Sequence, residues 1–121
     1  DGLGVAEIKT LEIEQIIIST EINPVVTARA NKLGINCLQG VNNKKKALKI
    51  YCNNNNLDLK NVGYIGNDIN DKDVMKIVGF TFCPSDAHDS IQLISNYVLK
   101  TKGGDGVIRE LLELIIKNKE K

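Results

Sequence analysis

Short apolar runs alternate along the whole chain with segments whose apolar residues recur every three or four positions. The runs have the length and composition of buried strands, and the periodic segments are typical of amphipathic helices. The expected strands are 15–20, 35–38, 62–65, 80–83 and 97–99, and the expected helices are 5–13, 24–33, 43–51, 71–78, 87–93 and 107–115. This alternation predicts an α/β fold in which helices cover both faces of a parallel sheet.

Turn-forming residues mark the ends of several expected helices. Pro24, which follows Asn23, suits the first position of a helix, and Gly34 suits the position just after its end. Asn42 or Asn43 is expected to cap the next helix, and the polar stretch 53–56 is expected to form a turn.

A polar loop follows the apolar run 62–65, and it offers Asn67, Asp68, Asn70 and Asp71. In open α/β sheets, ligands bind just beyond the carboxyl ends of the parallel strands. Carboxylate and amide oxygens are the ligands that Mg²⁺ prefers. The same residue types also form ordinary turns and helix caps, and Asp71 could serve only as the cap of the helix after it. On chemistry alone, both interpretations stay open.

Composition narrows the function classes. The chain has 121 residues, a formal net charge of +1 and few aromatic residues, so we expect one domain and no nucleic-acid partner. No apolar run approaches the length of a membrane span, and we expect a cytoplasmic protein without a membrane partner. Cys37, Cys52 and Cys83 form no Cys-x-x-Cys pair, which favours reduced thiols over a zinc site or a disulfide framework. The single histidine, His88, makes a Ser-His-Asp hydrolase improbable.

Three features fall at the ends of expected strands or at the start of the next helix. Ser19 ends the first strand, Lys44 begins the helix after the second, and the loop 67–71 follows the third. If the sheet is parallel, these places meet at one edge, where a hydroxyl, an ammonium and carboxylates suit a Mg²⁺-assisted phosphoryl site. The alternatives are a serine that only ends a strand and a solvated face of lysines at 44–46.

A series of short motifs, in the same order along the chain, matches the signatures of one enzyme superfamily. The matching motifs are Asp1-Gly2-Leu3-Gly4, Ile17-Ile18-Ser19, Ala28 to Ile35, Gln39-Gly40-Val41 before Lys44, Tyr64 to Asp71, Asp86-Ala87-His88 and Gly103 to Glu110. On these motifs the chain resembles the haloacid dehalogenase (HAD) superfamily. Within it, the chain most resembles the 3-deoxy-D-manno-octulosonate (KDO) 8-phosphate phosphatase subfamily, including the phosphatase-like C-terminal domain of acylneuraminate cytidylyltransferases.

The resemblance implies a three-layer, Rossmann-like (HAD-like) fold and a Mg²⁺-dependent phosphomonoesterase that works through an aspartyl-phosphate. Its substrate would be a sugar-acid phosphate, of the KDO 8-phosphate or sialic acid 9-phosphate class, and its assembly a homotetramer. Ser19 and Lys44 would bind phosphate, and Asn67, Asp68 and Asp71 would hold the metal.

Three departures from the family pattern shape these expectations. No Asp-x-Asp-Gly motif follows an apolar strand, so the nucleophile is expected upstream of Asp1. We therefore expect residues 1–121 to form a single, N-terminally incomplete phosphatase domain that lacks the first strand and flap hairpin and is inactive alone. Asn67 stands where the family usually has a metal-binding Asp, and Ser19-Thr20-Glu21 replaces the usual Ser-Gly-Arg.

The resemblance to cytidylyltransferase-fused relatives, which often have such a substitution, supports an alternative function. In that alternative, the chain is a non-catalytic oligomerisation or regulatory domain that follows a cytidylyltransferase domain. A response-regulator-like domain fits less well, because Ser19-Thr20 supplies no acidic pair at the end of the first strand.

Overall fold

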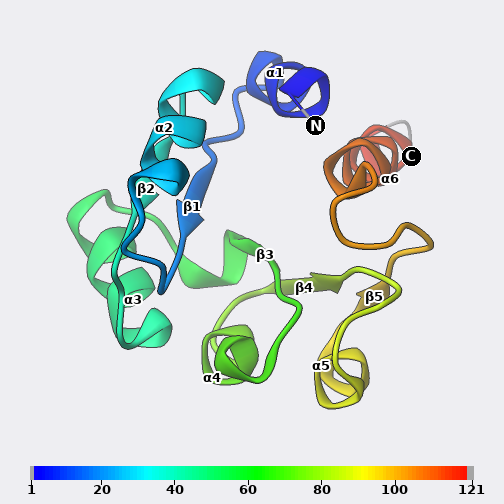
Figure 1. The fold of residues 1–121 in the computed structure, drawn as a ribbon. Coiled ribbons are helices and arrows are strands. Elements are labelled where there is room, and N and C mark those ends of the chain that lie inside the picture. Colours follow the sequence, from blue (N-terminus) through cyan, green and yellow to red (C-terminus); the bar gives the residue numbers. More distant parts are fainter. Residues whose placement is uncertain (1, 120–121) are drawn as a thin grey trace.

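The computed structural model describes residues 2–119 as alternating helices and short strands (Figure 1). The α-helices are α1 (Gly2–Thr10), α2 (Pro24–Leu33), α3 (Lys44–Asn54), α4 (Lys72–Met75), α5 (Asp89–Ile94) and α6 (Val107–Lys119). The strands are β1 (Ile16–Ile18), β2 (Asn36–Leu38), β3 (Gly63–Ile65), β4 (Phe80–Cys83) and β5 (Tyr97–Val98). Two 3₁₀ turns, η1 (Leu59–Asn61) and η2 (Ile69–Asp71), flank β3.

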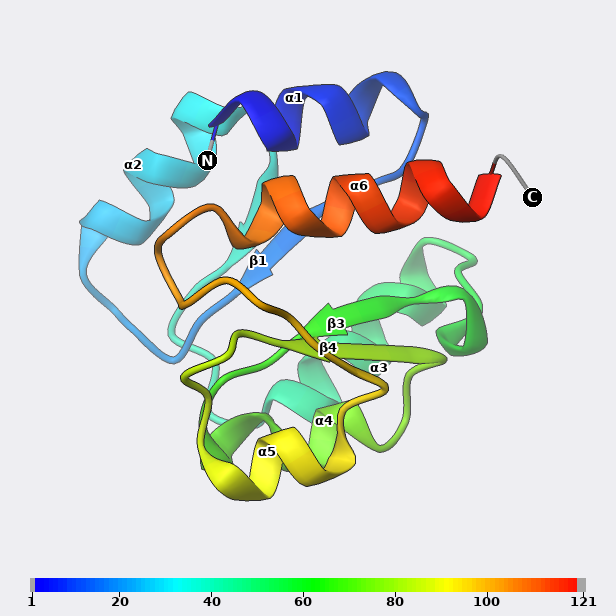
Figure 2. The same cartoon turned by 90° about the vertical axis from the view of Figure 1, so that its right-hand side faces the viewer.

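The strands form two parallel sheets between two layers of helices. β1 pairs with β2, and β3, β4 and β5 pair in that order, all in parallel. Figure 2 shows α1, α2 and α6 on one side of the strands and α3, α4 and α5 on the other. The predicted three-layer α/β fold with parallel strands is therefore confirmed.

Side chains and turn conformations explain where the central helices begin and end. The Asn23 carboxamide oxygen accepts a hydrogen bond from the Val25 N–H, and α2 ends at Gly34, whose φ of 72° lies in the left-handed region that favours glycine. Asn43, rather than Asn42, caps α3 by accepting a hydrogen bond from the Lys46 N–H.

Three expected boundaries were wrong. The helix predicted at 71–78 is only α4, because the amides of Lys76 and Ile77 bond three residues back and Gly79 already bonds to Leu59. α1 ends at Thr10 rather than at residue 13, since the chain turns through a positive φ at Glu12. α3 continues to Asn54, inside the stretch predicted as a turn.

The core on the α3–α5 side consists of two apolar clusters that share Tyr64. One cluster is built on Met75, Cys83, Ala87 and Ile91, and the other on Leu48, Cys52 and Val74. The Tyr64 ring packs against both, and this fixes the place of β3 over α4. On the other side, α1 packs along α6 and buries Val5, Ile8 and Leu112.

A large apolar cavity of about 1920 Å³ separates the two sheets. Its walls include both facing strands, Ile16–Ile18 and Gly63–Ile65, and Leu111 of α6. Within the described residues, β1 pairs only with β2 and β3 only with β4, so the facing edges of β1 and β3 have no partner strand (Figure 1). An unpaired sheet edge presents a row of N–H and C=O groups that can pair with another strand.

The described cysteines are all free thiols, with Cys52 and Cys83 buried and Cys37 half-buried, as expected. None of the helices formed by residues 2–119 has the length and apolar character needed to cross a bilayer.

Candidate functional site

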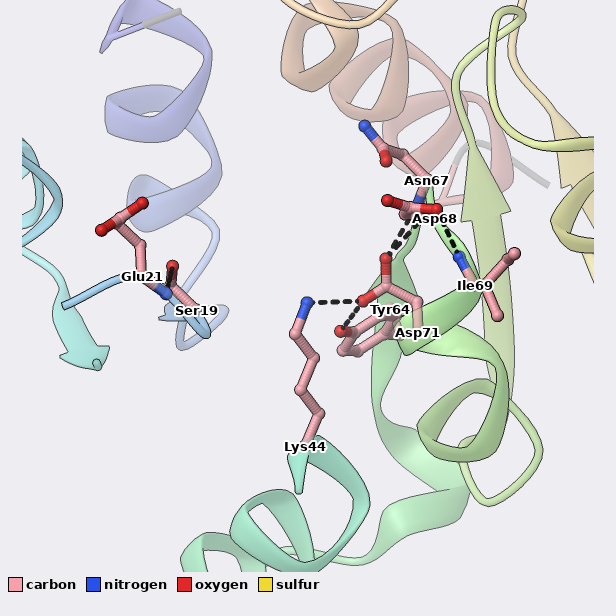
Figure 3. Close-up of polar contacts among 8 residues, drawn as sticks. All are labelled: Ser19, Glu21, Lys44, Tyr64, Asn67, Asp68, Ile69 and Asp71. Carbon is pink, nitrogen blue, oxygen red and sulfur yellow. Dashed lines mark hydrogen bonds and ion pairs between the residues drawn. The ribbon is translucent and has the colours of Figure 1, made fainter. Parts of the chain in front are cut away.

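A polar pocket of about 440 Å³ opens where β1 and β3 end. Ile18 ends β1 on one side of it, and Ile65 ends β3 on the other. Lys44, at the first position of α3, and the loop residues Asn67, Asp68, Asn70 and Asp71 also line the pocket. The predicted meeting of Lys44 with the acidic loop is confirmed, because Lys44 and the loop after β3 line the same pocket (Figure 3). They follow strands of different sheets, since Lys44 comes after β2 and the loop after β3.

The carboxylate of Asp71 is the centre of the site's hydrogen bonds. Its Oδ1 accepts one bond from Lys44 Nζ at 2.8 Å and one from the Tyr64 hydroxyl at 2.6 Å. Its Oδ2 accepts from the backbone N–H groups of Asn67 at 2.9 Å and Asp68 at 3.2 Å. The residue is 6% exposed. A buried carboxylate needs such partners, and these four donors tie the loop, β3 and α3 together.

The ionisation of Asp71 follows from these contacts. Burial by itself raises the pKa of Asp71, but the bonds from Lys44, from Tyr64 and from the two backbone amides outweigh it and hold that pKa below its ordinary value. The residue is therefore an anion at neutral pH. Asp71 makes no side-chain cap to α4, so its alternative role as the cap of that helix is excluded.

Tyr64 is the site residue that the sequence analysis left without a role. Burial, and then the bond to Asp71 and its negative charge, raise the pKa of Tyr64 far above its ordinary value, so its hydroxyl stays protonated and donates. The residue lies in an apolar run, where a tyrosine ordinarily signals only core packing. The only signal in the sequence that could have pointed to this role was a hydroxyl-bearing residue next to the end of an expected strand.

Lys44 differs from its two neighbours in the lysine run. Its side chain is 13% exposed and pairs with Asp71, whereas Lys45 and Lys46 are exposed. The expectation of a solvated face holds for Lys45 and Lys46 but not for Lys44. Its position at the start of α3 brings Lys44 to the lining of the pocket.

Asn67 and Asp68 are exposed and line the pocket, so their oxygens are accessible to a cation. One oxygen of Asp68 accepts a hydrogen bond from the Ile69 N–H at 2.7 Å, which holds the carboxylate over the start of η2. Across residues 2–119, no three His, Cys, Asp or Glu side chains gather into a metal-binding group. The exposed carboxylate of Asp68 and the amide oxygen of Asn67 can supply part of the coordination of a Mg²⁺ ion, and water or a phosphate must supply the rest.

Ser19 and Glu21 lie across from the acidic loop (Figure 3). Ser19 follows β1 and is held by backbone bonds to Leu38 and Val41, and its hydroxyl oxygen accepts from the Glu21 N–H at 3.0 Å. The residue does not line the polar pocket, although the adjacent Ile18 does. Glu21 accepts from the N–H groups of Ile22 and Asn23, each at 3.0 Å, so this carboxylate stabilises the turn into α2.

Two loops beside the pocket are fastened by other motif residues. The His88 N–H donates to the Asn67 carbonyl at 3.0 Å, and its ring accepts from the Ser90 N–H at 3.1 Å to cap α5. Asp86 accepts from the N–H of Gly103, which lines the pocket, at 2.8 Å. These contacts give His88 and Asp86 a role in holding the loops in place.

The loop before α6 is also tied to Glu110, and α6 is tied to α1. The Glu110 carboxylate accepts from the N–H groups of Lys100 at 3.0 Å and Thr101 at 2.9 Å. Arg109 pairs with Glu7 of α1 at 3.2 Å.

Comparison with known proteins identifies the family. The family model described as haloacid dehalogenase-like hydrolase matches residues 6–111. The KDO 8-phosphate phosphatase of Yersinia pestis is 34% identical over 122 aligned positions, which cover 100% of this chain and 65% of that protein.

The chain is also similar in fold to solved structures of this family. A putative HAD family hydrolase from Streptomyces avermitilis has a TM-score of 0.89 and 41% identity, covering 91% of this chain and 63% of that one. The KDO 8-phosphate phosphatase of Moraxella catarrhalis, solved with a magnesium ion, a phosphate ion and KDO, has a TM-score of 0.91 and 32% identity, covering 96% of this chain and 67% of that one. The chain thus spans somewhat less than two thirds of the curated relative that it matches.

Proposed function

Because this chain belongs to the haloacid dehalogenase-like hydrolases, we propose that it forms the phosphate-binding and metal-binding part of a phosphatase for a sugar-acid phosphate. The observation that carries the proposal is the Lys44–Asp71 pair, which lies beside the accessible carboxylate of Asp68 in one polar pocket. KDO 8-phosphate is the first candidate substrate, because relatives over the whole chain are named as its phosphatases. A sialic acid 9-phosphate is the second.

In this proposal the phosphoryl group lies between Lys44 and the end of β1. The ammonium offers positive charge and hydrogen bonds to the phosphoryl oxygens, and the Ser19 hydroxyl donates a further hydrogen bond. Ser19 can donate because the bond from the Glu21 N–H uses only an acceptor position of its oxygen. Both residues follow parallel strands, so rigid elements hold them in place.

The proposed metal is Mg²⁺, held by Asn67 and Asp68. Asp71, which the sequence analysis named as a third metal-binding residue, is proposed to hold the loop in place instead. Both of its oxygens accept hydrogen bonds from groups of the protein and the residue is buried, whereas Asp68 and Asn67 are exposed at the pocket. When bound, the metal would polarise a phosphoryl oxygen and neutralise developing charge. Asp71 would act on it indirectly, because its bonds to the amides of Asn67 and Asp68 shape the loop.

The nucleophile is proposed to come from upstream of Asp1, on a strand that fills the cavity between β1 and β3. Such a strand would join the two sheets into one and would end between Ser19 and Asp68. A carboxylate at its end would attack phosphorus while the sugar alcohol leaves, and water would then release phosphate from the aspartyl-phosphate. The apolar cavity and the free edges of β1 and β3 support this proposal.

The test is phosphate release by the full-length gene product, with Mg²⁺, from KDO 8-phosphate and from a sialic acid 9-phosphate. We expect release from one of them, and a loss of about a hundredfold or more in Lys44→Ala. Lys45→Ala is the matched control, since Lys45 is an exposed neighbour, and it should keep full activity. No release above background from either substrate would overturn the proposal.

The second candidate function is the non-catalytic C-terminal domain of an acylneuraminate cytidylyltransferase. The observation that favours it is Asn67, an uncharged side chain at the rim of the pocket. It predicts a cytidylyltransferase domain upstream and an assembly, proposed as a homotetramer, that survives Asp68→Ala. Sedimentation of wild-type protein and Asp68→Ala tests this, and a wild-type protein that stays monomeric at high concentration would count against it.

A further inference from the structure

Tyr64 is buried on its apolar side and polar at its tip. The ring packs between the two core clusters, against residues such as Met75 and Val74, so it has little freedom to move. The hydroxyl reaches the floor of the polar pocket, which Tyr64 lines together with Lys44 and Asp71. A rigid ring thus delivers one neutral donor to a charged pair.

The Tyr64 hydroxyl donates to the same Asp71 oxygen that accepts a hydrogen bond from Lys44. The Tyr64 hydroxyl lies 2.6 Å from Asp71 Oδ1, and Lys44 Nζ lies 2.8 Å from the same atom. The second oxygen, Oδ2, is taken by two backbone amides. Tyr64 therefore satisfies part of the carboxylate that faces Lys44 without adding charge.

The sharing of Asp71 Oδ1 with Tyr64 matters for the N–H donors of the Lys44 ammonium. An ammonium carries three N–H donors, and within residues 2–119 the hydrogen-bond partner of Lys44 Nζ is Asp71 alone. An Asp71 that lacked the Tyr64 bond would attract the ammonium more strongly, because a less satisfied carboxylate oxygen is a better acceptor where both side chains are largely shielded.

We infer that Tyr64 is a positioning residue for Lys44, whose ammonium it leaves available to a phosphate group in the pocket by sharing Asp71 Oδ1. That a phosphate group binds in the pocket rests on the proposed function. The effect of Tyr64 on the bond between Lys44 and Asp71 does not. The role is separate from packing, because it depends on the hydroxyl alone.

The first experiment measures binding of inorganic phosphate by calorimetry to the wild-type chain and to Tyr64→Phe. The variant keeps the ring and removes the hydroxyl, and we expect its affinity to fall by about three- to tenfold. Tyr51→Phe is the matched control, because the Tyr51 hydroxyl also bonds to a carboxylate, Glu14, at 2.9 Å, but away from the pocket. It should leave the affinity unchanged. Equal affinity in wild type and Tyr64→Phe, or an equal loss in Tyr51→Phe, would overturn the inference.

The second experiment observes Lys44 without any ligand. The proton resonance of the Lys44 ammonium, assigned with Lys44→Arg, should shift downfield in Tyr64→Phe as the bond to Asp71 strengthens, and should not shift in Tyr51→Phe. An unmoved resonance in Tyr64→Phe would contradict the inference. Absence of phosphate binding in the wild type, with the resonance shifted as expected, would instead count against the proposed function.

Discussion

The ammonium of Lys44 lies 2.8 Å from Oδ1 of Asp71, although 27 positions separate the two residues in the chain. This pair joins the first turn of α3 to the loop after β3, and both side chains are largely shielded, at 13% and 8% exposed. Through this pair, the connection from β2 to α3 and the connection from β3 to α4 form one polar site. We expect both the stability and the chemistry of the site to depend on this pair.

Replacing Asp71 by Asn should destabilise the fold. The change leaves Lys44 without its charged partner in a shielded place, which typically costs about 3 kcal/mol or more of the free energy of unfolding. Urea denaturation measures the loss. Asp73→Asn removes an exposed carboxylate from α4 and should change the free energy by only about 0.5 kcal/mol. An equal effect of both variants would show that the pair contributes nothing particular.

Stability should fall on acidification, and Asp71 should account for part of the fall. Because the folded-state pKa of Asp71 lies below its ordinary value, the unfolded chain binds more protons as the pH drops. The contribution is present above the unfolded-state pKa of about 3.9 and is lost as the pH falls through the lower, folded-state pKa.

Melting temperatures measured from about pH 6 down to about pH 2 test this, with Asp71→Asn flattening the acid side of the curve. The pKa of Glu110 is also lowered, since its bonds to Lys100 and Thr101 outweigh its partial burial, and so some slope should remain in that variant. A curve for Asp71→Asn that matches the Asp73→Asn curve would contradict the prediction.

Gly66 should not tolerate a side chain. A Cβ there would lie 2.5 Å from the Met75 sulfur and 2.9 Å from the Asp71 Cβ, both closer than atoms approach in proteins. Gly66→Ala should therefore cost about 1–3 kcal/mol in unfolding free energy through overpacking. Gly103→Ala is the matched control, because its nearest neighbour would lie at 3.5 Å, an ordinary contact. Thermal unfolding of the two variants distinguishes a requirement for space from a general effect of losing a glycine.

Asn67→Asp should strengthen binding of Mg²⁺. The variant adds a charged oxygen ligand beside Asp68, and ligand charge is a main determinant of affinity for such cations, so we expect a gain of about tenfold by calorimetry. Asn70→Asp places the same charge elsewhere on the pocket and should have a smaller effect. Equal gains would mean that Mg²⁺ responds to the total charge of the pocket and that Asn67 is no ligand.

Local sequence determined the order of the elements and many of their ends. Alternation of apolar runs with helical periodicity is visible in neighbouring residues, and so are caps such as Asn23 and Gly34, because these depend on contacts a few positions apart. The same local reasoning, with the rule for parallel strands, placed Lys44 near the acidic loop. It failed at α4, where the amides of Lys76 and Ile77 bond three residues back and the amide of Gly79 bonds to Leu59.

Only the tertiary structure decided which role each residue of the site has. Asp68 and Asp71 look alike in sequence, yet Asp68 is exposed, whereas Asp71 is buried with four donors around it. Tyr64 joins the site because packing against two clusters directs its hydroxyl to Asp71. The separation of the strands into two sheets with a cavity between them likewise depends on contacts between distant segments. Such contacts leave no periodic signal in the sequence, because they depend on where whole elements pack.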